Sequence, residues 1–292
     1  MGCTCCSTHG YAKAEAAMPN WHFARLPSLW LLAAIVIAAL FAPWLAPQNP
    51  YDLAQIDLLD SRLPPGSSGY LLGTDEQGRD LLSAMLYGLR ISLMVGFAGS
   101  ALAFIGGSAL GLIAGYRGGR WEALIMRLAD LQLAFPAILV ALVLLALLGP
   151  GLGKVVIALA TAQWAYFART ARAAALVEGR KDYIAAARLS GLGGPRIVWR
   201  HLLPNCLPPL LVVLPLQIAA AIALEATLAF LGLGAPATEP SLGLLIANGF
   251  QYLLAGNYWI SFYPGALLAI TIVAINLVAD QLRTWLDPRN SR

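Results

Sequence analysis

Six apolar stretches constrain the fold of this chain more than any other feature. A helix needs about 20 apolar residues to cross the roughly 30 Å hydrocarbon core of a bilayer. Because 59% of the 292 residues are hydrophobic and only 12% are charged, the composition excludes an ordinary soluble domain. We predict an all-α integral membrane protein with spanning helices at 26–46, 91–115, 128–148, 152–167, 207–233 and 260–279, of which 152–167 is the shortest.

The basic residues indicate how these spans are oriented. Lys and Arg collect in the cytoplasmic loops of membrane proteins. If both termini face the cytoplasm, only Arg62, Arg79, Arg90 and Lys154 of the 19 basic residues lie outside. Omitting the span at 152–167 would move the most basic loop to the outer side, so six spans are favoured over five. The net charge of +4 therefore reflects membrane topology rather than nucleic-acid binding.

The spans divide the chain into five parts. We expect a cytoplasmic tail at 1–25, a first helix at 26–46, an outer segment at 47–90, a five-helix core at 91–282 with a cytoplasmic loop at 169–206, and a cytoplasmic tail at 283–292. The first span is expected to stay uncleaved, because its apolar run is too long for a signal peptide. Cys3, Cys5 and Cys6 crowd the first tail, where thiols could bind a metal or a lipid, and we assign them no function.

Two outer segments carry distinctive side chains. Residues 72–80 read Leu-Gly-Thr-Asp-Glu-Gln-Gly-Arg-Asp, in which Asp75, Arg79 and Asp80 are close enough in sequence to pair. The second segment, 232–259, contains an apolar run at 242–250. We predict that this run forms a short helix over the outer mouth of the protein.

The loop at 169–206 is basic and able to form a short helix. Consecutive alanines at 185–187 favour a helix, Gly191 can end it, and Pro204 allows only a restart. A short helix outside the membrane predicts a docking surface for a soluble protein. The alternative is an amphipathic helix lying on anionic lipid, with its arginines at the headgroups.

Within the spans, one acidic residue and three glycines need an explanation. Glu225 either lines a substrate route or hydrogen-bonds a neighbouring helix, and the second interpretation is favoured. Gly107, Gly111 and Gly115 recur at four-residue spacing, which lets helix backbones approach closely. We expect these glycines to pack within the chain or against a partner.

The chain contains no nucleotide-binding motif. A phosphate-binding loop needs Gly-x-x-x-x-Gly-Lys followed by Ser or Thr, and the Gly-Lys pair at 153–154 has Leu148 and Val155 at the flanking positions. With three histidines and no cluster of His, Asp or Cys at ligand spacing, we expect no catalytic, cofactor or metal site. We therefore expect no nucleotide hydrolysis by this chain.

Four sequence blocks, taken together, resemble the permease subunits of binding-protein-dependent ABC importers. The resemblance is specifically to the second (C-type) permease of the dipeptide, oligopeptide and nickel group. The blocks lie at 72–93, 185–204, 225–234 and 280–289. The first is similar to that group's Leu-Gly-Thr-Asp-x-x-Gly-Arg-Asp signature, and the second is similar to the cytoplasmic EAA loop of importer permeases. Ala185 replaces the first Glu of the EAA pattern, and His201 stands where an aliphatic residue is usual.

The resemblance implies a type I importer permease (MetI-like) fold in the bacterial inner membrane, with a periplasmic loop between the first two of six helices. It implies a heterodimer with a homologous permease, two P-loop ATPase subunits that bind ATP and Mg, and a periplasmic substrate-binding protein. Peptides are the implied substrate, with nickel as the alternative. A secondary transporter is the alternative class, for which more intramembrane ionisable groups are expected. The implied ATPase-coupling residues are Asp182, Ala185, Ala186, Ala187, Arg188, Gly191, His201 and Pro204.

Overall fold

The computed structural model of the chain describes residues 27–52, 56–67, 69–234 and 241–286. These residues form helices joined by turns, with one isolated antiparallel bridge between Thr74 and Asp80. The predicted tail at 1–25, with Cys3, Cys5 and Cys6, lies outside the described residues, as does most of the predicted tail at 283–292.

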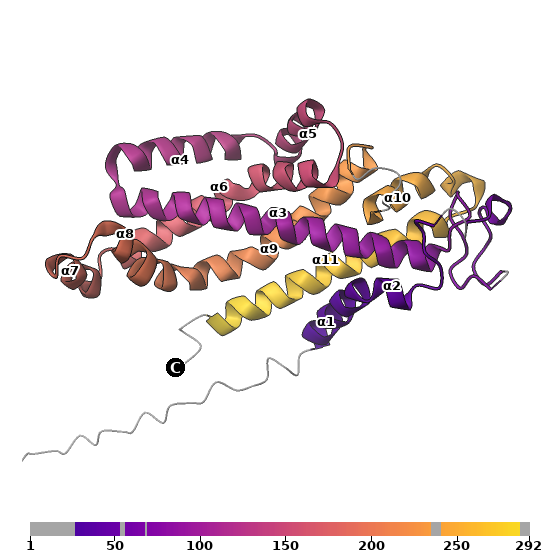
Figure 1. Ribbon diagram of the computed structural model, residues 1–292, viewed down its shortest axis with the longest axis horizontal. Helices are drawn as coiled ribbons and strands as arrows, with labels where there is room; N and C mark the ends of the chain where they lie inside the picture. The colour runs from indigo at the N-terminus through magenta and orange to yellow at the C-terminus, as the bar shows by residue number, and fades with distance from the viewer. Residues whose placement is uncertain (1–26, 53–55, 68, 235–240, 287–292) are drawn as a thin grey trace, which may run out of the picture.

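The long helices run along one axis of the molecule, as Figure 1 shows. Helices α7 and α8 lie at one extreme, called here the α7 end, and α10 lies with the turns of 56–80 at the other, called the α10 end. In chain order the elements are α1 (Pro27–Leu40), α2 (Ala42–Leu45), η3 (Leu58–Asp60), α3 (Leu81–Arg117), α4 (Gly119–Ala134), α5 (Ala137–Leu148), α6 (Leu152–Glu178), α7 (Asp182–Leu189), α8 (Gly194–Ile197), η4 (Val198–Leu202), α9 (Leu203–Phe230), α10 (Leu242–Phe250), η5 (Leu253–Ala255) and α11 (Trp259–Leu286).

Three helical runs among the described residues are long and apolar enough to cross a membrane, namely Leu81–Arg117, Gly194–Phe230 and Trp259–Leu286. Helices α4 and α5 pass the same test as a pair, which brings the number to four if they form one broken span. Helix α1 is apolar but has only 14 residues. The structure thus supports three or four crossings, and six remains a prediction.

The predicted span at 128–148 is wrong as one uninterrupted helix. Helix α4 ends at Ala134, α5 begins at Ala137, and the two are bent by 94° relative to each other. Pro136 has no N–H to donate, and it forces the preceding Phe135 into an extended conformation with φ −97° and ψ 141°. The first predicted span is likewise interrupted, at Phe41, because the next short helix carries a proline in its first turn.

Two other expectations about the elements have clear outcomes. The predicted short helix at 242–250 is confirmed as α10. Helix α3 begins at Leu81, ten residues before the predicted span at 91–115. Its early start has a local cause, since Asp80 caps the helix and its Oδ2 accepts a hydrogen bond of 2.9 Å from the Ser83 N–H.

Helices α3 and α6 pack in parallel, with almost no space between their backbones. A Cβ added to Gly107 would lie 2.3 Å from the Trp164 carbonyl oxygen, and one added to Gly111 would lie 2.2 Å from the Ala168 carbonyl oxygen. At Gly115 it would lie 2.6 Å from the Ala175 Cβ. The partner numbers rise together along both helices, so the helices run in the same direction. Only glycine permits this approach.

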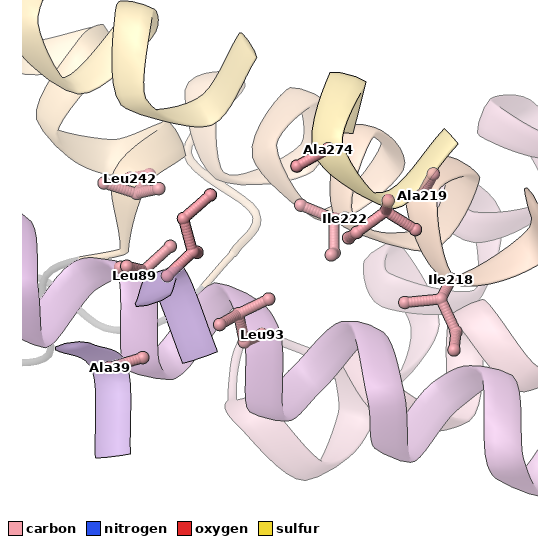
Figure 2. Packing of buried hydrophobic residues seen from close by; sticks show 10 residues of the cluster. Ala39, Leu89, Leu93, Ile218, Ala219, Ile222, Leu242 and Ala274 are labelled. Carbon is pink, nitrogen blue, oxygen red and sulfur yellow. The ribbon is translucent and has the colours of Figure 1, made fainter. Parts of the chain in front are cut away.

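A buried apolar cluster joins α1, α3, α9, α10 and α11 toward the α10 end. Figure 2 shows Leu89 and Leu93 of α3 near Ile218 and Ile222 of α9, with Leu242 of α10 above them. Helices α1 and α11 contribute to the same cluster. The buried members are Ile35, Ala39, Leu89, Leu93, Ile218, Ala219, Ile222, Leu242, Ala274 and Ile275.

We predict that Gly111→Val destabilises the folded chain, because the new methyl groups would collide with the backbone of α6 and force the helices apart. Overpacking of this kind costs about 1–3 kcal/mol or more. The melting temperature of the detergent-solubilised protein measures the effect. Gly106→Val is the matched control, since it lies on the same helix and has nothing within 4 Å of an added Cβ. Equal melting temperatures for the two variants would contradict the packing account.

Candidate functional site

Helix α7 presents one exposed face and one buried face at the α7 end. Ile184 is fully buried and Ala187 is nearly so, and both pack with Ile197 of α8. Ala185 and Ala186 are exposed, and so are Asp182, Tyr183, Arg188 and Leu189, so the outward face of α7 combines two small side chains with larger charged, polar and apolar ones. Asp182 lies in the first turn and Arg188 in the last, which is the charge order that a helix dipole favours.

Three polar side chains fix the junction between α6 and α7. Glu178 at the end of α6 accepts hydrogen bonds from Lys181 Nζ at 2.7 Å and from the Tyr183 hydroxyl at 2.8 Å. Burial and, as the second cause in size, the hydrogen bond to Glu178 raise the pKa of Tyr183 to about 12. The hydroxyl therefore remains a donor throughout the physiological pH range, and its contribution to stability is lost only as the pH rises through that value.

A glycine turn fixes the other end of α7. Gly191 has φ +74°, a conformation that costs other residues about 1–2 kcal/mol. The Gly191 N–H donates to the Arg188 carbonyl at 3.0 Å, and the Leu192 N–H donates to the Ala187 carbonyl at 3.2 Å. These two bonds form a Schellman motif, and Leu192 packs on the cluster that contains Ala187. The prediction that Gly191 ends this helix is confirmed.

The return from α8 into α9 is a continuous helical run rather than the predicted restart at Pro204. The run extends from Gly194 to Phe230. Residues 198–202 form a π turn, in which the Leu203 N–H donates to the Val198 carbonyl. Pro204 has no N–H with which to continue the i→i−4 pattern, and the wider turn lies directly before it. The Asn205 side chain donates to the His201 carbonyl at 2.6 Å and satisfies that oxygen.

Tyr116, near the α7 end of α3, connects this region to the α3–α6 pair. The Arg188 guanidinium lies 5.3 Å from the centre of the Tyr116 ring, a cation–π contact. The ring also packs on the cluster formed by Ile184 and Ile197. Helix α7 is thus attached to α6 by the chain and to α3 by Tyr116.

The structure brings together six of the eight predicted coupling residues, in α7 and its terminal turn. His201 and Pro204 instead belong to the return run. Sequence reasoning missed Glu178, Tyr183 and Tyr116. The spacing of Glu178, Lys181 and Tyr183 across one helix end is the signal that could have identified the first two, whereas nothing local identifies Tyr116.

Glu225 lies in a buried polar contact between three helices. Its side chain is 1% exposed, and the Ser92 hydroxyl of α3 donates to its Oε2 at 2.9 Å. The Leu242 N–H at the start of α10 in turn donates to the Ser92 Oγ at 3.4 Å. The other carboxylate oxygen, Oε1, has no partner within the described part of the chain. This geometry favours helix packing as the role of Glu225.

A second buried polar contact, which sequence reasoning missed, joins α3, α6 and α9. Gln163 Nε2 donates to the Gln217 carbonyl at 2.9 Å, and the Ser100 hydroxyl lies 3.2 Å from Gln163 Oε1. Polar groups buried among apolar helices need such partners.

The turns of 69–80 are hydrogen-bonded to α10 and α11. The predicted pairing is confirmed for Asp75 and Arg79, whose buried Oδ2 and Nε lie 2.6 Å apart. Asn248 of α10 donates to Glu76 Oε1 at 2.7 Å, and the Trp259 ring N–H donates to the Thr74 carbonyl at 3.4 Å. Burial, reinforced by the neighbouring negative charge of Asp75, raises the pKa of Glu76. Among the residues that the structure describes, no three His, Cys, Asp or Glu side chains form a metal cluster.

Two families match different parts of the chain. Residues 107–292 match the family described as the binding-protein-dependent transport system inner membrane component. Residues 26–65 match the N-terminal transmembrane domain of oligopeptide transport permease C.

Named relatives match along most of their length. A di/tripeptide transport system permease protein, DppC, of Pseudomonas aeruginosa is 42% identical over 90% of this chain and 88% of its own. A dipeptide transport system permease protein, DppC, of Escherichia coli is 40% identical over 92% of each chain. A putative peptide transport system permease protein of Brucella suis is 44% identical over 89% of this chain and 86% of its own.

The fold also has a solved counterpart. A chain of the MetNI methionine ABC transporter in an inward-facing conformation superposes with a TM-score of 0.57, over 70% of this chain and 97% of that one. The two sequences are 21% identical, so the superposition shows a shared fold alone. The predicted MetI-like permease fold is confirmed at this level.

We predict that Glu225→Leu destabilises the protein by about 1–3 kcal/mol, because it leaves the buried Ser92 hydroxyl without its acceptor. Glu225→Gln should retain most of the stability, since an amide oxygen can accept the same bond. Thermal unfolding in detergent measures both variants. If Gln proves as disruptive as Leu, the hydrogen bond is not what holds α3 to α9 at this point.

Proposed function

The chain belongs to the family of binding-protein-dependent transport system inner membrane components, and on that premise we propose that it is the permease subunit of an ABC importer for di- and oligopeptides. The relatives named as peptide or dipeptide permeases support the substrate class, and they match this chain over nearly its whole length. Nickel receives no comparable support.

The observation that carries a permease role is the way α7 is held. Its exposed face of Ala185, Ala186 and Leu189 lies beyond the long helices, and both of its ends are fixed. The two alanines let the backbone of α7 approach a groove of a soluble ATPase closely, and the 89% exposed Leu189 side chain can insert into that groove. Because α7 follows directly from α6, a displacement of α7 would be passed to the packed α3–α6 pair.

The charge distribution supports a cytoplasmic α7 end. Near this end Arg172 and Arg169 pair with Glu122 and Asp130 of α4, and Lys181 pairs with Glu178. The guanidinium groups of Arg188 and Arg117 lie over aromatic rings. The basic residues near this end are Arg117, Arg120, Arg127, Arg169, Arg172, Arg180, Lys181, Arg188, Arg196, Arg200 and Arg283. We infer that both termini are cytoplasmic and that the α10 end faces the periplasm of a bacterial inner membrane.

The exposed surfaces suggest where the partners of the importer would bind. Helix α4 carries a row of exposed apolar side chains that a homologous permease or lipid would cover. This row consists of Trp121, Leu124, Leu128 and Leu131, and the exposed Phe135 follows directly after the helix. A periplasmic binding protein would meet α10 and the turns of 56–80. Two ATPase subunits would supply ATP and Mg binding, and this chain would bind no cofactor.

Deleting the gene from its source bacterium tests the proposed substrate. We expect uptake of a labelled dipeptide to fall in the deletion strain and to recover on restoration, while nickel uptake measured in parallel stays constant. If nickel uptake alone falls in the deletion strain and recovers on restoration, nickel replaces peptides as the proposed substrate. The assignment as an importer subunit would then stand. No change in either uptake would contradict transport of both solutes.

A further inference from the structure

Arg90 carries a positive charge that nothing in the described part of the chain neutralises. It lies on the exposed face of α3, and no hydrogen bond, ion pair or ring contact in that part engages its side chain. Arg79, by contrast, is buried against Asp75, and Arg188 lies over a tyrosine ring. A guanidinium without such a partner can bind an anion from outside the chain.

A cavity of about 340 Å³ lies beside Arg90, between α3, the start of α6 and the segment that follows α2. Tyr51 and Tyr87 form one wall, with their rings edge to face and 5.1 Å between centroids. Ile91, Met94 and Leu152 form an apolar floor. The cavity therefore combines one cation, two aromatic rings with polar tips, and an apolar surface.

The exposed face of α3 places this cavity at the edge of the bilayer. Below Arg90 the face is apolar until Arg117, which lies 5.9 Å from the centre of the Trp121 ring. The step of 27 positions from Arg90 to Arg117 corresponds to about 40 Å of helix, close to the thickness of a bilayer with its headgroups. The exposed apolar side chains of this face include Met94, Phe97, Ile105 and Ile113. Arginine and aromatic rings mark both boundaries, so Arg90 lies at the headgroups of the leaflet on the α10 side.

We propose that this cavity is a binding site for a glycerophospholipid of that leaflet. The Arg90 guanidinium binds the phosphodiester, for which its paired N–H donors are suited. Tyr51 and Tyr87 flank the headgroup, and the acyl chain begins on Met94 and Leu152. The bound lipid would join the segment after α2 to α3 and α6. This inference goes beyond peptide transport and does not depend on it.

The apolar floor favours a lipid over the carboxylate of a passing peptide. The floor continues into the exposed face of α3, where an acyl chain can extend toward Phe97. A peptide would gain one charged contact at Arg90 and leave its polar backbone against apolar side chains.

Lipid titration of the purified transporter, containing the full chain and its partner subunits, tests the site by native mass spectrometry. The probes are dioleoylphosphatidylglycerol and dioleoylglycerol, which have the same acyl chains but differ by the phosphate and headgroup. We expect Arg90→Gln to weaken phosphatidylglycerol retention by about tenfold, the effect of losing one charge-assisted contact, and to leave dioleoylglycerol retention unchanged. Arg90→Lys, which keeps the charge, should lose less.

Arg62→Gln is the matched control, since it removes the same charge at the same end of the molecule, where Arg62 lies over the Tyr252 ring instead of at the cavity. Equal retention of phosphatidylglycerol by the Arg90→Gln and Arg62→Gln variants would overturn the proposal. A higher KM for peptide uptake in Arg90→Gln with unchanged lipid retention would also overturn it, by assigning the cation to the substrate. If Arg90→Gln does not assemble, unchanged phosphatidylglycerol retention in Tyr87→Leu, which removes a ring from the cavity, would likewise overturn the proposal.

Discussion

The close contact between α3 and α6 is the constraint on which the rest of the structure depends. Because Gly107, Gly111 and Gly115 lie against the α6 backbone, the two helices cannot slide or separate without losing several contacts together. At the α7 end this pair holds α7 through Glu178 and Tyr116. At the α10 end, α3 contributes Ser92 to the contact with Glu225. One rigid pair therefore connects both ends of the molecule.

Local signals in the sequence predicted the features that local chemistry determines. Gly191 ends α7 because only a residue that tolerates positive φ fits there, and the following Leu192 completes the motif. Asp75 and Arg79 pair because they are four residues apart in a tight turn. The apolar run at 242–250 forms α10, and the Ser241 side chain caps it by accepting a hydrogen bond from the Leu244 N–H.

The sequence could not reveal features that depend on distant partners. Ser92 and Glu225 are 133 positions apart in the sequence, and no pattern in either helix predicts their contact. The break at Pro136 was visible in the sequence, but the length of the apolar run favoured one span. Proline at that position outweighs hydropathy because the missing N–H and the extended Phe135 act on the backbone directly.

Replacing Gly191 tests most directly whether α7 must be held rigidly to couple ATP hydrolysis to transport. In the assembled transporter, Gly191→Val should lower peptide uptake while membrane insertion and ATP hydrolysis continue, because valine cannot adopt φ +74° without strain. Gly193→Val is the control, since φ at Gly193 is −64° and an added Cβ has open space. Parental uptake per ATP in Gly191→Val would contradict the coupling role of α7.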